Sequence, residues 1–91
     1  IVIDDGAVKA LLNKGSSLLP KGIVRVESDF LRGATVLVAD EKGNTLARGL
    51  TRYSSDELNL ICGKHSDAFE QILGFTHGDV AIHRDDLVLV K

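Results

Sequence analysis

The sequence predicts a compact α+β domain, mostly β with short helices, whose strands are mixed and largely antiparallel. The chain has 91 residues, which is enough for one domain. Short β-branched runs recur along it, and two of them are separated by a short glycine-containing connection typical of a hairpin. Single glycines separate these runs from short amphipathic stretches. This pattern favours a small barrel with inserted helices over a doubly wound parallel sheet.

The first predicted elements are a short strand over residues 1–3 and a capped helix. Asp4 or Asp5 offers a carboxylate that can cap the start of this helix. Gly15 ends it, because glycine readily adopts the left-handed conformation of a helix C-cap. The expected apolar face consists of Ala7, Val8, Leu11 and Leu12.

Alternating and β-branched residues predict the remaining strands, after a loop around Pro20. In residues 23–28, Val24 and Val26 alternate with charged residues, so we expect a half-buried strand that turns both valines inward. Residues 41–44 contain a glycine and favour an antiparallel hairpin between the strands on either side. The expected strands after the first are 23–28, 35–40, 45–52, 80–82 and 87–90.

Two further short helices are predicted between the hairpin and the last strands. Ser54 and Glu57 have the spacing of a capping box, which satisfies free backbone N–H groups where a helix begins. A second helix runs from Ser66 to Gly74. The expected apolar faces are Leu58, Ile61 and Cys62 in the first helix and Phe69, Ile72 and Leu73 in the second. Cys62 is therefore expected to be a small core residue.

The composition is that of an ordinary soluble globular chain, with 44% hydrophobic and 26% charged residues. No apolar run approaches the ~20 residues of a membrane span, and no signal segment opens the chain. A single cysteine excludes an internal disulfide, so we expect a cytoplasmic protein without a membrane anchor. The apolar start and the absence of methionine suggest a domain excised from a larger protein.

Motifs that would carry chemistry are incomplete. Residues 63–66 contain a Gly-Lys pair but lack the earlier glycine and the directly following hydroxyl residue of a phosphate-binding loop. Residues 83–85 match three letters of a protein-kinase catalytic loop without the rest of that fold. The single cysteine and the three histidines lack the paired spacing of a zinc site. We expect no catalytic residue, cofactor site or metal ligand in this chain.

The charge distribution proposes one functional surface. The net charge is −2, which argues against general attraction to nucleic acid, but residues 6–26 carry four cations and no acid. Lysine, serine and glycine residues in a loop are suited to contact phosphate oxygens. The candidate RNA-binding residues are Lys9, Lys14, Ser16, Ser17, Lys21 and Arg25. The alternative is that Leu18 and Leu19 attach this loop to the core while the lysines only keep it soluble.

The order of the motifs resembles the PUA domain family across essentially the whole chain. The general resemblance rests on residues 3–7, 10–11, 17–20, 22–23, 30 and 32–33. A second group of motifs resembles the C-terminal PUA domains of glutamate 5-kinases in particular. That group consists of residues 47–50, 53–55, 63–66, 72–75 and 83–89. The pattern departs from this subfamily at Ser28 and Ala34.

The resemblance implies a single PUA domain over residues 1–91, folded as a pseudo-barrel of mixed strands. It implies a parent enzyme, a homo-oligomer, that transfers the γ-phosphoryl group of ATP to glutamate with Mg²⁺ in proline biosynthesis. The catalytic residues of that enzyme would belong to an amino-acid-kinase domain preceding Ile1. The present chain would then be an accessory domain with a regulatory or assembly role and no catalysis of its own.

Elsewhere, PUA domains commonly bind RNA through the first helix, the following loop and the next strand. Those elements correspond here to residues 9–25, the segment that the charge distribution also selects. The expected partners are therefore the kinase domain of the parent chain and RNA, the latter bound weakly and in a salt-dependent manner. The alternative identity is the RNA-binding PUA module of an enzyme that modifies tRNA or rRNA.

Overall fold

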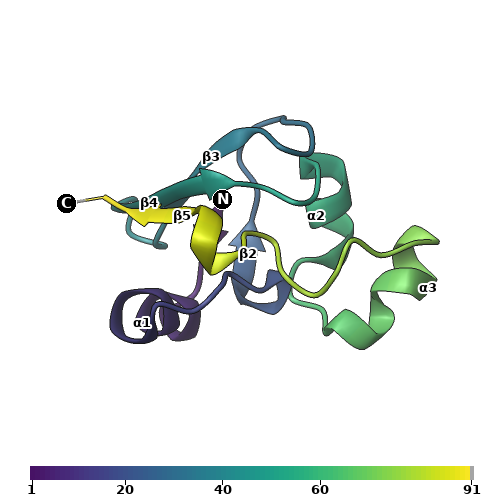
Figure 1. Ribbon diagram of the computed structural model, residues 1–91, viewed down its shortest axis with the longest axis horizontal. Coiled ribbons are helices and arrows are strands. Elements are labelled where there is room, and N and C mark those ends of the chain that lie inside the picture. Colours follow the sequence, from purple (N-terminus) through teal and green to yellow (C-terminus); the bar gives the residue numbers. More distant parts are fainter. Residues whose placement is uncertain (91) are drawn as a thin grey trace.

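The computed structural model describes residues 1–90, which contain five strands, three α-helices and three short 3₁₀ helices (Figure 1). In chain order the elements are β1 (Val2–Ile3), α1 (Asp5–Lys14), η1 (Pro20–Gly22), β2 (Ile23–Arg25), β3 (Thr35–Ala39), β4 (Thr45–Leu50), α2 (Ser55–Ile61), η2 (Ser66–Ala68), α3 (Phe69–Leu73), η3 (Arg84–Asp86) and β5 (Leu87–Leu89). In the view of Figure 1, α1 lies below strands β3 to β5, and α2 and α3 lie to their right.

The strands form one mixed sheet in the order β2-β1-β3-β4-β5. The pairs β1–β2, β3–β4 and β4–β5 are antiparallel, and β1–β3 is parallel. This arrangement confirms the predicted α+β class with largely antiparallel strands. The expected strands at 23–28, 45–52 and 80–82 differ most from the structure, and the strand at 45–52 ends at Leu50. The strand at 23–28 ends at Arg25, and residues 80–82 contribute only an isolated bridge between Leu18 and Ile82.

Local capping signals are realised as the sequence predicts. The Asp4 carboxylate accepts from Ala7 N at 2.8 Å at the start of α1, and Gly15 ends that helix with φ of 60°. At the start of α2, Ser54 Oγ accepts from Glu57 N at 3.2 Å, and Glu57 Oε1 accepts from Ser54 N at 2.7 Å. Both helices therefore begin at residues whose side chains satisfy otherwise free N–H groups.

The hairpin between β3 and β4 is confirmed, and its turn is stabilised by a single carboxylate. Asp40 Oδ1 accepts from the backbone N–H groups of Lys42 and Asn44, each at 2.9 Å. An aspartate that bonds the backbone two and four residues ahead fixes the turn from within the hairpin. The register of β3 on β4 is therefore set by local chemistry.

The hydrophobic core lies between the inner face of the sheet and the helices. Its buried members are Ile3, Leu11, Leu18, Ile23, Val36, Val38, Ala47, Tyr53, Leu58, Ile61, Phe69, Ala81 and Ile82. Each helix uses a narrower apolar face than the sequence predicts. Leu12 in α1 and Ile72 in α3 are exposed, whereas Leu11 and Phe69 are buried.

Two further burial predictions are wrong. Val24 is exposed because Ile23, paired with Ile3 on β1, is the residue that β2 turns into the core. Cys62 follows α2 as its C-cap and is only half-buried, with its thiol 3.7 Å from the carbonyl of Asn59. The thiol is therefore at the border of the core, and Cys62→Ser removes little apolar burial.

Within residues 1–90, every helix is too short or too polar to span a bilayer.

We expect Gly49→Ala to destabilise the domain by about 1–3 kcal/mol, the usual cost of overpacking a close contact. A Cβ at position 49 would lie 2.7 Å from both the Asp86 carbonyl oxygen and Ile82 Cγ2. Gly6→Ala is the matched control, because a Cβ in α1 meets only an ordinary contact at 3.4 Å and alanine favours the helix. Urea unfolding of both variants checks this, and equal stability for the two would contradict the packing described here.

Candidate functional site

A hollow of about 460 Å³ lies between α1 and the chain leading to β2. It is lined by Asp4, Gly6, Ala7, Ala10, Ser16, Ser17, Leu18, Leu19, Lys21 and Gly22. Three of the six predicted site residues, Ser16, Ser17 and Lys21, therefore line one cavity. This hollow is the candidate site, and we call it the α1 hollow.

Close backbone contact between α1 and η1 forms the floor of the α1 hollow. Asp4 N donates to the Gly22 carbonyl at 2.9 Å. A Cβ on Gly22 would lie 2.7 Å from Ala7 Cβ, so only glycine allows this approach. On the opposite side, Leu18 is buried and its N–H donates to the Ile82 carbonyl at 2.9 Å. The loop is thus attached to the core through Leu18, while Leu19 remains exposed.

The polar groups of the α1 hollow have mixed charge. Ser17 Oγ accepts from Arg84 N at 2.8 Å, which orients the hydroxyl and leaves its O–H free to donate. The Asp4 carboxylate, which caps α1, and the exposed Lys21 both line the hollow. A phosphate group is therefore favoured near Lys21 and the serines, whereas a hydroxyl or amino group of the same ligand suits Asp4.

The other three predicted residues do not line this hollow. Lys9 and Lys14 are exposed on α1, where they contribute charge to the surroundings. Arg25 Nε donates to Glu27 Oε1 at 2.8 Å and lines a different hollow on the sheet. An arginine paired with a carboxylate has less capacity to neutralise a phosphate. The predicted group of four cations is thus reduced to three lysines.

A second hollow, of about 240 Å³, adjoins the first. The sequence did not predict it. The two cavities share Leu19 and Lys21, and the second adds Pro20, Lys64, His65, Ser66 and Asp79. The backbone holds residue 63 to this loop, since Gly63 N donates to the Pro20 carbonyl at 2.8 Å. Residues 63–66 fail as a phosphate-binding loop, but Lys64 extends the cationic surface that begins at Lys21. We call the two hollows together the cationic groove.

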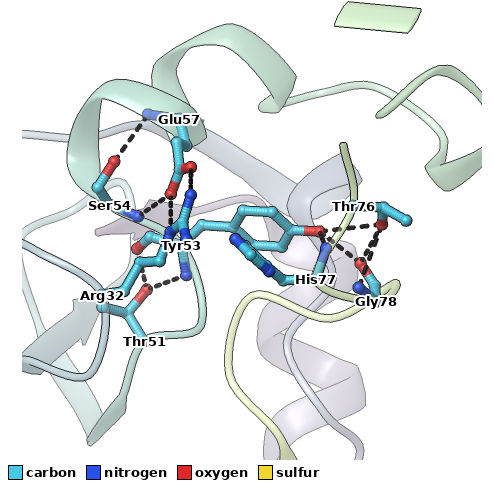
Figure 2. A network of polar contacts seen from close by, with 8 residues as sticks. All are labelled: Arg32, Thr51, Tyr53, Ser54, Glu57, Thr76, His77 and Gly78. Carbon is cyan, nitrogen blue, oxygen red and sulfur yellow. Dashed lines mark hydrogen bonds and ion pairs between the residues drawn. The ribbon is translucent and has the colours of Figure 1, made fainter. Parts of the chain in front are cut away.

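A polar network around the segment between β4 and α2 centres on the buried Tyr53 (Figure 2). The Tyr53 hydroxyl donates to the Gly78 carbonyl at 2.6 Å and accepts from His77 N at 2.9 Å. Thr51 Oγ1 donates to the Tyr53 carbonyl at 2.6 Å. The Tyr53 hydroxyl therefore has both a hydrogen-bond acceptor and a hydrogen-bond donor within the chain. The network therefore holds the segment around His77 against the core.

Arg32 and Glu57 form a two-pronged ion pair beside this network (Figure 2). Arg32 Nε donates to Glu57 Oε1 at 2.9 Å, and Arg32 Nη2 donates to Oε2. The guanidinium also lies 5.0 Å from the centre of the Phe75 ring, within cation–π range. The hydrogen bonds from Arg32 lower the pKa of Glu57 to about 2. Such a carboxylate stays ionised at neutral pH and is unsuited to proton transfer, so the pair is structural.

The remaining acids and histidines do not converge on one point. Among residues 1–90, no group of three or more His, Cys, Asp or Glu side chains is arranged to hold a metal ion. His83 approaches Asp85 at 3.5 Å on the exposed η3. The arrangement as a whole suits binding of a polar or anionic ligand along the cationic groove.

Comparison with known proteins gives a consistent result. A family profile described as "PUA domain" matches residues 1–73. The chain is 56% identical to the glutamate 5-kinase of Aliivibrio fischeri over 99% of its own length and 24% of that protein's. It is 52% identical to the glutamate 5-kinase of Deinococcus radiodurans over 99% of its own length and 25% of that protein's. The chain thus spans about a quarter of the length of these relatives.

Solved structures show the same fold. A PUA domain from Aeropyrum pernix K1, solved as a tartrate complex, matches with a TM-score of 0.63 and 25% identity, over 90% of this chain and 39% of that one. A conserved PUA domain protein from Thermoplasma acidophilum matches with a TM-score of 0.63 and 24% identity, over 90% of this chain and 44% of that one.

We expect Glu57→Gln to destabilise the domain by about 1–2 kcal/mol near pH 7, because a charged hydrogen-bonded pair becomes a neutral one at a partly exposed site. The Glu57 side chain is 12% exposed, and its pKa is lowered from 4.5 to about 2. Its contribution is therefore complete above pH 4.5 and is lost as the pH falls towards 2.

The free energy of unfolding, measured with urea, should differ less and less between wild type and Glu57→Gln as the pH falls from 4.5 towards 2. Glu70→Gln on the exposed surface of α3 is the control and should change little. A pH-independent difference for Glu57→Gln would contradict the assignment of the ion pair.

Proposed function

The chain belongs to the PUA domain family, and from this premise we propose that it is the non-catalytic accessory domain of a glutamate 5-kinase. The observation that carries this proposal is the match at 56% and 52% identity over 99% of the chain. In such an enzyme, a separate amino-acid-kinase domain would transfer the γ-phosphoryl group of ATP to the side-chain carboxylate of glutamate. The present domain would modulate that activity or the assembly of the enzyme into a homo-oligomer in the cytoplasm.

The chemistry of the described residues supports an accessory role. Phosphoryl transfer requires carboxylates that hold Mg²⁺ and cations that cradle the transferred phosphate. In residues 1–90, Asp4 caps α1, Asp40 stabilises the hairpin turn and Glu57 pairs with Arg32. These acids have structural partners. In this proposal, ATP and Mg²⁺ bind to the kinase domain.

Removing residues 1–91 from the full-length enzyme should leave glutamate phosphorylation within about tenfold of the intact enzyme. The deletion should instead change feedback inhibition by proline or the subunit number. The 91-residue chain alone should show no saturable ATP binding by calorimetry. Complete loss of phosphorylation by a folded, soluble deletion variant, or micromolar ATP binding by the domain alone, would contradict an accessory role.

A second candidate function, RNA binding along the cationic groove, is favoured by the continuity of its two hollows. Lys21 belongs to both, so a phosphate backbone can contact the serines of the first hollow, then Lys21 and then Lys64 of the second, with Asp4 and Asp79 as the acids of the same lining. The net charge of −2 limits the affinity. This function is compatible with a glutamate 5-kinase and with an RNA-modifying enzyme. The nature of the two relatives supports the former.

RNA binding should be weak and salt-dependent. The cations available to phosphates are Lys9, Lys14, Lys21 and Lys64, since Arg25 is paired with Glu27. Release of about four counterions gives a slope of log affinity against log salt near −3 or shallower for single-stranded RNA. Titration of structured and single-stranded RNAs at low salt measures this slope.

Joint charge reversal, Lys14→Glu with Lys21→Glu, should abolish RNA binding and shift the melting temperature by only a few degrees, about 2–4 °C at most. Lys42→Glu in the hairpin turn is the control and should retain binding. Equal RNA affinity for wild type and the double variant, or an affinity that does not change with salt concentration, would exclude the cationic groove as an RNA surface.

A further inference from the structure

The outer face of the sheet carries a row of apolar side chains that nothing within residues 1–90 covers. The register pairs Leu37 on β3 with Arg48 on β4, and Arg48 with Val88 on β5. Directly paired residues project from the same face of a sheet. Leu37 and Val88 are 57% and 56% exposed, and Arg48 lies exposed between them.

The next row extends this apolar surface. Thr35 pairs with Leu50, which is 45% exposed. The intervening residues of β3, Val36 and Val38, are buried in the core on the inner face. β3 therefore has apolar residues on both faces, a pattern typical of strands that are covered on both sides. An exposed apolar cluster of this kind marks an interaction surface. We call Thr35, Leu37, Arg48, Leu50 and Val88 the outer sheet face.

A hollow of about 590 Å³ adjoins the outer sheet face and shares Thr35 and Leu37 with it. Three acids, Glu27, Asp29 and Asp40, also line the hollow with Arg25, which is paired with Glu27, and Ile1 belongs to its wall. The amino group of Ile1 donates to the Leu37 carbonyl at 2.9 Å. A polypeptide joined to residue 1 would therefore leave the domain directly beside the outer sheet face.

We propose that the outer sheet face and the adjoining hollow form the docking surface for the kinase domain of the same polypeptide. This inference rests on the proposed function, in which the relatives are about four times as long as the present chain. A connection near Ile1 would hold the kinase domain at high local concentration beside this face, so modest contacts suffice for docking. The partner surface is apolar, with a carboxylate opposite Arg48 and a cation opposite Asp29, because Glu27 is paired with Arg25 and Asp40 stabilises the hairpin turn.

Other occupants fit this surface less well. In a symmetric dimer centred on the row, Arg48 would face its own copy, because a two-fold interface pairs identical patches. Two like charges brought together in this way oppose association. RNA is disfavoured because three acids and one arginine line the hollow, and the row holds one further cation. The kinase domain is favoured because a chain joined to residue 1 would hold it beside both the apolar row and the hollow.

Thiol labelling of the full-length enzyme tests the proposal. Single cysteines are introduced as Leu37→Cys, Val88→Cys and Leu60→Cys in a Cys62→Ala background. Leu60 on α2 is the matched control, because it is 56% exposed and lies away from the sheet. Each rate is divided by the rate for the same variant unfolded in guanidinium. Positions 37 and 88 should react at least tenfold more slowly than position 60.

Equal normalised rates at the three positions would overturn the proposal. Concentration-dependent protection of positions 37 and 88 in the separate 91-residue chain would also overturn it, in favour of a second copy. Arg48→Glu should restore fast labelling of position 37 in the full-length enzyme, whereas Lys64→Glu should leave it slow. Glutamate phosphorylation is assayed on the same samples. A full-length protein that does not phosphorylate glutamate refutes the proposed function. Fast labelling of positions 37 and 88 in an active enzyme refutes only the docking.

Discussion

The backbone from Thr51 to Ser55 is the constraint on which the two long loops of the structure depend. Ser55 N donates to the Phe30 carbonyl at 3.0 Å, and Arg52 N donates to the Ala81 carbonyl at 2.8 Å. The buried Tyr53 adds its hydroxyl bonds to the segment around His77. The loops before β3 and after α3 contain little regular structure of their own, so a short segment after β4 satisfies their backbone groups. Long irregular segments remain ordered when their polar groups find partners in this way.

The segment from Thr51 to Ser55 is also connected to the α1 hollow, through residue 81 and two further hydrogen bonds. Ala81 N donates to the Leu18 carbonyl at 2.7 Å, and Leu18 N donates to the Ile82 carbonyl at 2.9 Å. Residue 81 is therefore bonded both to Arg52 and to the loop that forms one wall of the hollow. Because Leu18 is fully packed in the core, the neighbouring Ser17 and Leu19 are held at fixed positions on the surface. The hollow is a property of the folded core and not of a free loop.

Sequence reasoning succeeds where the determining contacts are local and fails where they are not. The Ser54–Glu57 capping box was predictable because its partners lie within one helical turn. The exposure of Val24 was not, since it depends on which residue of β2 pairs with Ile3 across the sheet. In the candidate site, the sequence could group Ser16, Ser17 and Lys21 because they lie close together along the chain, and the structure places them in the lining of one hollow. Lys64 joins them only through the contact between residues 20 and 63, which spacing along the chain does not reveal.

The two candidate surfaces differ in the chemistry that they offer a partner. The cationic groove presents exposed lysine ammonium groups and serine hydroxyl groups, which suit a hydrated polyanion that is released as the salt concentration rises. The outer sheet face presents rigid β-strand side chains around a single guanidinium, which favours a dry, lasting contact with a folded surface. They are built from different elements, namely α1, η1 and η2 for the groove and β3 to β5 for the face. A partner that docks on the outer sheet face as proposed would therefore not occupy the residues that line the groove.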